Sequence, residues 1–232
     1  MPFKDRAEAG KRLAQSLLKY KERNPVVLAL PRGGVPVAAE VAAALHAPLD
    51  LILVRKIGLP GQEELAMGAV VDGGTAITVR NDDVIRMAGI SAAEFAAVRD
   101  RELAEIERRR QHYIGTRARA DITDRVAIVI DDGIATGATT RAALQALRLR
   151  KPKMLILAVP VAPSDTIAAM RAEADVVVCL EDYEIFGAIG VYYSDFRQIS
   201  DHEVIATLAR FPAQSPEEGQ MPPQPPKPTA AG

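Results

Sequence analysis

The 232-residue sequence contains one cysteine, Cys179, three histidines and no tryptophan. A single cysteine excludes a disulfide within the chain, and so few Cys and His side chains argue against a zinc site built from them. No apolar run approaches the roughly 20 residues of a membrane-spanning helix. The charged first residues lack the apolar segment of a signal peptide, so we expect a cytoplasmic protein.

An excess of charge of either sign is also missing. The chain has 29 Lys and Arg residues against 30 Asp and Glu residues, so its formal net charge is -1 at pH 7. This balance produces no general attraction to nucleic acid or to an anionic membrane, and we expect neither as a partner. With 48% hydrophobic and 25% charged residues, the composition is that of an ordinary globular protein.

Proline is concentrated at the end of the sequence. Residues 212–232 contain seven prolines and almost no apolar side chains, a composition that cannot form a packed core. We predict a disordered tail, and the PPQPPKP stretch within it is either solvated or a polyproline ligand. Residues 1–211 then form a single folded domain.

Short apolar runs alternate with Ala-rich segments of helical length in residues 1–211. Such runs are typical of strands buried on both faces of a parallel sheet. They are residues 26–30, 51–54, 126–130, 154–159 and 176–180, and the helical segments are residues 35–45, 139–148 and 164–171. The alternation predicts an α/β fold with a parallel sheet and helices on both faces. A helix with one buried face comes first, carrying Ala9, Leu13, Leu17 and Tyr20.

A long charged helix is predicted over residues 91–113, within a helical region (81–120) that interrupts this alternation. Four side chains form a narrow apolar stripe along it: Phe95, Leu103, Ile106 and Tyr113. The run Arg108–Arg110 has two readings. It is either a phosphate or nucleic-acid patch, or a solvated helix face on which Glu105 pairs with Arg108 or Arg109. The solvated face is the simpler reading, and the sequence favours it.

One stretch combines groups that bind phosphates and sugars. The apolar run 126–130 ends in Asp131 and Asp132, and a loop of small residues then leads into a predicted helix. Ligands of open α/β sheets bind at the carboxyl ends of strands, and small residues let backbone N–H groups approach an anion there. Because carboxylates repel phosphate, Asp131 and Asp132 require hydroxyl groups or a cation as partners. A sugar phosphate meets both conditions.

Competing motifs fail in this stretch. No Gly-Lys-Ser/Thr follows Gly137, as a Walker A loop requires, and the dinucleotide fingerprint G-x-G-x-x-G is absent here. The Gly-x-Ser-x-Gly elbow of hydrolases is absent from the whole chain. A phosphoacceptor signalling domain accounts for the acidic pair but not for the Ala-Thr-Gly-Ala-Thr loop.

Residues 128–139, IVIDDGIATGAT, closely resemble the signature of type I phosphoribosyltransferases, which bind 5-phosphoribosyl 1-diphosphate (PRPP). The resemblance implies that Asp131 and Asp132 contact the 2′ and 3′ hydroxyls of ribose and favour its developing positive charge. It also implies that five residues hold the 5′-phosphate: Ala135, Thr136, Gly137, Ala138 and Thr139.

Two basic segments continue the resemblance, which covers most of residues 25–200. The loop after the first apolar run, with Arg32, Gly33 and Gly34, is similar to the family's pyrophosphate loop. Glycines there let main-chain N–H groups reach a diphosphate, and Arg32 supplies charge. Arg55 and Lys56, which we expect at the end of the second strand, resemble the family's basic contacts to PRPP.

Two further segments resemble mobile or variable parts of that family. Residues 59–67 are in the place of its flexible catalytic loop, with a turn at Pro60 and Gly61, so we expect a mobile lid that excludes water. Residues 181–200 are in the place of its small hood. Phe186 and Tyr192 there are candidates to stack on a nucleobase, although a hydrophobic core of the hood explains them equally well.

The sequence therefore predicts an α/β core like that of type I phosphoribosyltransferases, with a small C-terminal hood and a long helical insertion. The resemblance implies a glycosyltransferase of nucleotide metabolism that moves 5-phosphoribosyl from PRPP to a nitrogen acceptor such as a nucleobase, releasing pyrophosphate. It implies Mg²⁺ bound through PRPP, with Asp131 and Asp132 as the side chains near it, and a homodimer. The alternative is a non-catalytic regulator that senses PRPP or a nucleotide. Arg32, Arg55 and Lys56 favour the enzyme.

Overall fold

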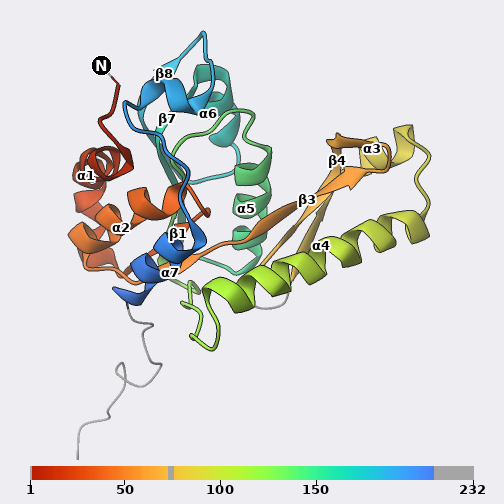
Figure 1. Ribbon diagram of the computed structural model, residues 1–232, viewed down its shortest axis with the longest axis horizontal. Coiled ribbons are helices and arrows are strands. Elements are labelled where there is room, and N and C mark those ends of the chain that lie inside the picture. The colour runs from red at the N-terminus through yellow and green to blue at the C-terminus, as the bar shows by residue number, and fades with distance from the viewer. Residues whose placement is uncertain (1, 73–75, 212–232) are drawn as a thin grey trace, which may run out of the picture.

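A five-stranded parallel sheet forms the body of the molecule (Figure 1). The computed structural model describes residues 2–72 and 76–211, so the predicted tail, residues 212–232, lies outside the described residues. The strand order is β2-β1-β6-β7-β8, and neighbouring strands pair in parallel. The strands of this sheet are β1 (Pro25–Ala29), β2 (Leu49–Leu51), β6 (Val126–Ile130), β7 (Met154–Pro163) and β8 (Val176–Tyr183).

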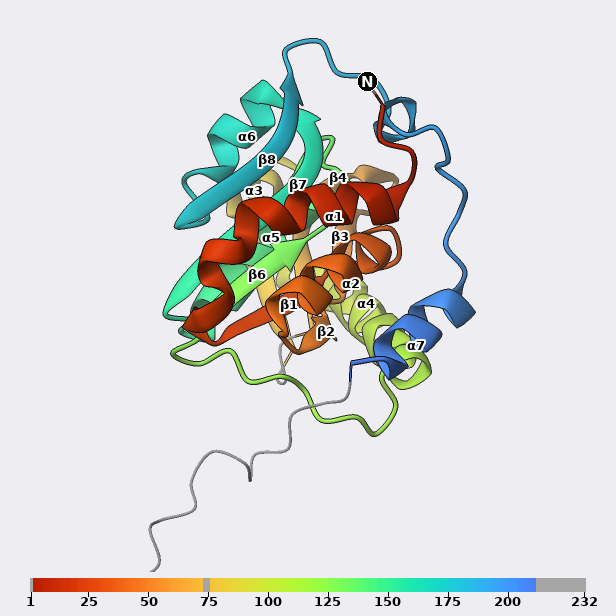
Figure 2. The ribbon, with the colours of Figure 1, turned by 90° about the vertical axis from the view of Figure 1, so that its left-hand side faces the viewer.

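Helices cover both faces of this sheet, as the sequence predicts. The helices α1 and α2 lie in front of the strands in Figure 2, and α5 and α6 pack on the opposite face. The bounds are α1 (Arg6–Leu17), the 3-10 helix η1 (Leu18–Arg23), α2 (Gly34–Leu45), α5 (Ala138–Leu149) and α6 (Ser164–Met170). Successive side chains of a strand therefore enter different cores: Ile128 packs with α1 and α2, and Val129 with α5 and α6. Burial on both sides explains the continuous apolar runs.

The second apolar run departs from the prediction. Residues 51–54 do not form one strand, because β2 ends at Leu51 and Val54 begins the next strand, in a different sheet. The N–H of Ile52 makes the last bond to β1, at Ala29 O (3.0 Å), and Leu53 O already accepts from Asp72 N in the second sheet (2.8 Å). Arg55 and Lys56 therefore lie at the start of a strand, and the prediction that they end the second strand was wrong.

The second sheet belongs to an arm that extends from the body (Figure 1). It is antiparallel, in the order β3-β4-β5, and two helices accompany it. These elements are β3 (Val54–Leu59), β4 (Gln62–Val71), β5 (Ile77–Arg80), α3 (Asp82–Met87) and α4 (Ala92–Tyr113). The turn at Pro60 and Gly61 lies where the sequence predicts it, but residues 59–67 form the closed end of a hairpin rather than an irregular loop. Their motion as a lid stays a prediction.

The helix α4 begins and ends where the sequence predicts. Ser91 caps its N-terminus in a capping box with Glu94. Phe95 and Ile106 of the predicted stripe are buried, and α4 packs against β3 and β4. At its other end the Tyr113 hydroxyl donates to Asp201, the first residue of α7 (Asp201–Ala209), at 2.5 Å. The insertion therefore joins the arm to the body.

The N-terminal segment anchors the region predicted as a hood. Phe3 N donates to Tyr192 O and Ser194 N donates to Phe3 O, both at 2.8 Å, beside the 3-10 helix η2 (Ile189–Tyr192).

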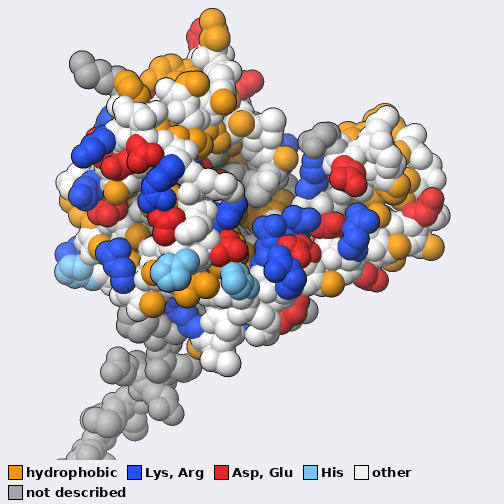
Figure 3. Space-filling model, viewed as in Figure 1, with side chains coloured by type: hydrophobic (Ala, Val, Ile, Leu, Met, Phe, Trp, Pro, Cys, Tyr) orange, Lys and Arg blue, Asp and Glu red, His pale blue; other side chains and the backbone are white. Residues whose placement is uncertain are grey.

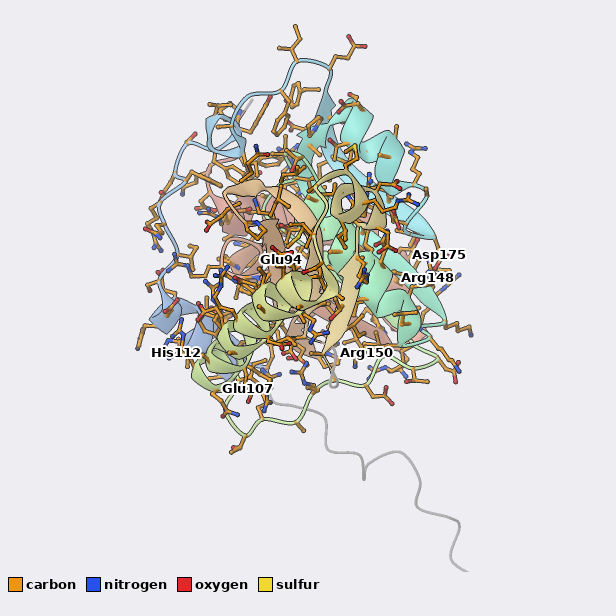
Figure 4. The ribbon with its side chains drawn as sticks, turned by 90° about the vertical axis from the view of Figure 1, so that its right-hand side faces the viewer. Glu94, Glu107, His112, Arg148, Arg150 and Asp175 are labelled. Carbon is orange, nitrogen blue, oxygen red and sulfur yellow. The ribbon has the colours of Figure 1, made fainter. Side chains whose placement is uncertain are left out.

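On the far side of the sheet, Arg148 of α5 donates to Asp175 at 2.9 Å, next to the start of β8 (Figure 4). Among the helices described, none combines the length and the apolar character needed to cross a membrane.

Candidate active site

The predicted diphosphate loop and the acidic loop leave the sheet side by side. They follow β1 and β6, which are adjacent parallel strands with Ala29 opposite Ile130. Leu30 N continues the ladder by donating to Ile130 O at 2.9 Å. The structure thus brings together the two segments that the sequence assigns to one site, at the carboxyl edge where ligands of such sheets bind.

Glycine is required where these loops meet. A Cβ atom added at Gly33 would lie 2.1 Å from Asp132 Oδ2, and one added at Gly34 would lie 2.7 Å from Ile130 O and 2.9 Å from Asp131 Cα. No side chain fits at such distances, so the diphosphate loop packs its backbone directly on the acidic residues. The peptide bond between Pro31 and Arg32 is cis.

Asp131 is half-buried at the end of β6, and its Oδ1 accepts a hydrogen bond from Asp132 N at 2.9 Å. Burial of the carboxyl and the nearby charge of Asp132 raise the pKa of Asp131 well above its usual range, against the opposing effect of Arg6. A carboxyl in such surroundings gains from a hydroxyl donor or a cation brought by a ligand. A strongly shifted pKa at a loop junction is typical of functional sites.

Arg6 is the partner of Asp132 and was not predicted from the sequence. Arg6 Nε donates to Asp132 Oδ2 at 2.7 Å, and the two side chains are only 9% and 10% exposed. The guanidinium lies 3.8 Å from the centre of the Phe196 ring, and the Tyr193 hydroxyl donates to the Asp132 carbonyl. Asp132 is thereby oriented by α1 and the hood together. Nothing in the charged N-terminal sequence distinguishes Arg6 from its neighbours.

The loop predicted to hold the 5′-phosphate leads into α5. Gly137 is the N-cap residue with φ at 74°, and no side chain of the described residues caps the helix there. The first-turn N–H groups therefore lack helical acceptors and suit an anion. Thr166 Oγ1 donates to Ala135 O at 3.0 Å, which ties the loop to α6. Four of its five residues are exposed: Ala135, Thr136, Ala138 and Thr139.

Two pockets adjoin this loop. One of about 60 Å³ lies between the two loops and is lined by Pro31, Arg55, Arg109, Asp131 and Thr139, together with four apolar residues. The other, of about 490 Å³, lies between the arm and α5, where Figure 3 shows the surface hollowed between the arm and the body. Its lining includes Lys56, Thr136, Ala138 and Thr139. Val54 and Thr139 line both pockets, so the two pockets adjoin each other at the start of α5.

The predicted arginines are held by carboxylates. Arg55 Nε donates to Glu102 Oε2 of α4 at 2.8 Å, and Glu102 is buried. Arg32 Nη1 lies 3.4 Å from Asp201 Oδ1 at the start of α7. Each guanidinium is thus paired with a carboxylate, Arg32 within the diphosphate loop and Arg55 outside it, while Lys56 is exposed in the larger of the two pockets.

Phe186 and Tyr192 stack on each other, with ring centres 4.8 Å apart, and Tyr183 stacks on Tyr192 at the same distance. All three pack against a small core that contains Phe3 and Tyr193. They line neither of the two pockets described above. Their packing agrees with the hydrophobic-core reading of the hood, and contact with an acceptor stays a prediction.

A divalent cation at this site would need oxygen atoms from its ligand. Among residues 2–72 and 76–211, no group of three His, Cys, Asp or Glu side chains could hold a metal ion. Asp132 is paired with Arg6, so Asp131, which lines the small pocket, is the carboxylate of the acidic loop that could contact a cation there. These residues fit Mg²⁺ that arrives with a diphosphate and is not held by the protein alone.

Comparison with known proteins agrees with this geometry. The model of the phosphoribosyl transferase domain family matches residues 3–197. Two relatives from Mycobacterium tuberculosis, strains CDC 1551 / Oshkosh and H37Rv, are both named "Putative phosphoribosyl transferase" and are 46% identical over 219 residues. The match covers 94% of this chain and 49% of each relative, so the chain spans about half of their length. The crystal structure of TT1426 from Thermus thermophilus is similar at a TM-score of 0.82 and 38% identity, covering 92% of this chain and 100% of that one.

Proposed function

This chain belongs to the phosphoribosyl transferase domain family, and from that premise we propose that it transfers the 5-phosphoribosyl group of PRPP to a nitrogen acceptor. In the reaction, the bond between C1 and the diphosphate oxygen breaks, the acceptor nitrogen forms a bond to C1 with inversion, and pyrophosphate leaves. The observation that carries the proposal is the meeting of the diphosphate loop, Asp131 and the uncapped start of α5 around one pocket. A nucleobase is the proposed acceptor, and that choice rests on the family resemblance.

Each part of the site has a role in this transfer. The N–H groups of residues 135–139 bind the 5′-phosphate, and Asp131 and Asp132 accept hydrogen bonds from the ribose hydroxyls. Their negative charge also stabilises the positive charge that develops on the ribose ring as the C1–O bond breaks. Arg32, Arg55 and Lys56 hold the diphosphate as it acquires charge. The protein therefore acts by positioning and charge stabilisation.

Asp131 would be the side chain that helps to hold Mg²⁺ arriving with the donor, and a bound Mg²⁺ would supply charge neutralisation for the leaving group. The buried ion pair with Arg6 keeps Asp132 oriented for one hydroxyl. We assign no general base, because the roles proposed for Asp131 and Asp132 are toward the ribose hydroxyls, and residues 133–139 contain no carboxylate, imidazole or amine side chain.

Pyrophosphate release tests the proposal. The protein is incubated with PRPP and Mg²⁺ and with each member of a panel of nucleobases and other nitrogen compounds. Release with one acceptor, reduced about a hundredfold or more by Asp131→Asn, supports the transferase. Binding of PRPP without release for any acceptor favours the regulator instead. Activity near the wild-type level in Asp131→Asn contradicts the site assignment.

A further inference from the structure

Arg109 belongs to the helical insertion but lies in the donor site. It comes from α4 and lines the pocket of about 60 Å³ together with Pro31 of the diphosphate loop, Arg55 and Asp131. The sequence favours a solvated helix face for Arg108–Arg110. That reading fits Arg108, which is 67% exposed, but not Arg109, which is 39% exposed and faces the pocket.

The two neighbouring arginines use Glu105 differently. Arg108 donates to it from both Nε and Nη2, at 2.7 and 3.0 Å, so one edge of its guanidinium is engaged in a bidentate pair. Arg109 donates only from Nε, at 2.8 Å. Its Nη1 and Nη2 atoms make no hydrogen bond to the described part of the chain, and these two groups remain able to donate to a ligand. Glu105 thus orients Arg109 and engages one of its nitrogen atoms.

The C-terminal half of α4 turns one face to the donor site. Glu102, Arg109 and Tyr113 follow one another at spacings of seven and four residues, which places them on one side of a helix. Glu102 holds Arg55, and Tyr113 donates to Asp201, the carboxylate beside Arg32. Figure 4 shows His112 of the same helix end beside α7, and its Nε2 lies 3.3 Å from Asp201.

Three arginines, one in the diphosphate loop and two beside it, are consequently each paired with a carboxylate of another residue. The pairs are Arg32 with Asp201, Arg55 with Glu102 and Arg109 with Glu105. Figure 3 shows Lys and Arg side chains gathered beside acidic ones where α4 meets the body. A diphosphate carries several negative charges, and planar guanidinium groups bind such oxygens with two parallel hydrogen bonds.

We propose that Arg109 binds the diphosphate of the donor, so that the helical insertion supplies part of the active site, with Glu105 as a positioning residue. The inference rests on the proposed function, because it assumes that PRPP occupies the loops after β1 and β6. It assigns to α4 a role that the sequence resemblance does not contain.

The test measures affinity for inorganic pyrophosphate and for PRPP, each with Mg²⁺, by titration calorimetry on the full chain. Arg109→Ala is expected to weaken both at least about tenfold, the effect of losing one charge-assisted contact. Affinity for ribose 5-phosphate, which lacks the diphosphate, is expected to stay within about twofold. Arg108→Ala is the matched control. It removes the adjacent cation, which also pairs with Glu105, but Arg108 does not line the pocket. Its affinities for both ligands are expected to match those of the wild type.

A second variant, Arg109→Lys, keeps the charge and removes the planar donor pair. It is expected to bind pyrophosphate more weakly than the wild type and more tightly than Arg109→Ala. Wild-type pyrophosphate affinity in both Arg109 variants overturns the inference and leaves the proposed function standing. If the wild type itself binds neither PRPP nor pyrophosphate, the proposed function fails and the role of Arg109 fails with it.

Discussion

Asp131 and Asp132 are neighbours in the sequence, but their surroundings give them different properties. Asp132 forms a buried ion pair with Arg6, whereas Asp131 accepts a hydrogen bond from the backbone N–H of Asp132 and has a raised pKa. Substitutions at the two positions therefore test different things. A change at Asp131 reports on ligand binding, while a change in the Asp132 pair also removes support from the fold.

Asp131→Asn is predicted to change how stability depends on pH. The pKa of Asp131 is raised in the folded state, so this state binds more protons than the unfolded chain, and its stability falls as pH rises from about 4 through the folded pKa. The variant lacks this loss and keeps the acceptor for Asp132 N. Urea unfolding is expected to show it at least as stable as the wild type at pH 8, with the difference shrinking toward pH 4. A difference that does not vary with pH contradicts this assignment.

Arg6→Met is predicted to destabilise the protein by about 3–5 kcal/mol, because it leaves Asp132 buried without its charged partner. The control is Arg12→Met in the same helix. Arg12 is 44% exposed and pairs with Glu181, so its loss is expected to cost less than about 1 kcal/mol. Chemical denaturation of both variants measures the contrast, and equal losses would show that the buried pair contributes no more than a surface pair.

At the scale of elements, continuous apolar runs identify β1 and β6 because helices cover both faces of the sheet. The break between β2 and β3 is not predictable in this way. Residues 51–54 are all apolar and buried or half-buried, so hydrophobicity cannot show where the chain changes sheets. Residues 60–63, at the closed end of the next hairpin, are Pro, Gly, Gln and Glu and are exposed, a pattern that resembles that of a loop.

The residues of the candidate site that the sequence predicts are contiguous, and those it does not predict come from separate helices. The loops after β1 and β6 carry their own chemistry in contiguous residues, so the sequence predicts both. Arg6, Glu102 and Asp201 are single charged residues, and only the packing of α1, α4 and α7 brings them to the loops. Arg109 lies in the run Arg108–Arg110, for which the sequence offers a phosphate patch but favours a solvated face.

Gly34→Ala is predicted to disturb the junction of the two loops. The added Cβ would meet backbone atoms of Ile130 and Asp131, which cannot move without shifting β6. We expect a loss of about 1–3 kcal/mol in stability and at least about tenfold in PRPP affinity. Gly187→Ala in the hood is the control, because the nearest atom to its Cβ would be 3.8 Å away. Normal PRPP binding by Gly34→Ala would show that the loops are not packed as described.

At the scale of the whole molecule, residues 2–72 and 76–211 form a body and an arm joined by α4. The proposed donor site lies where they meet, so arm and body each contribute cations to it. The predicted tail lies outside the described residues, and its composition offers almost no apolar side chains to pack. Deleting residues 212–232 is therefore expected to leave the thermal midpoint within experimental error. A clear drop would show that the tail contributes to the folded state.

Binding of PRPP is the central claim, and thermal unfolding with PRPP and Mg²⁺ tests it most directly. A ligand at a hundredfold excess over its Kd stabilises the native state by about 2.7 kcal/mol. For a protein of this size that corresponds to a rise of about 5–11 °C in the thermal midpoint. We predict a saturable rise that requires Mg²⁺ and is smaller with ribose 5-phosphate. No shift at millimolar PRPP would contradict the donor site, and the transferase proposal would fall with it.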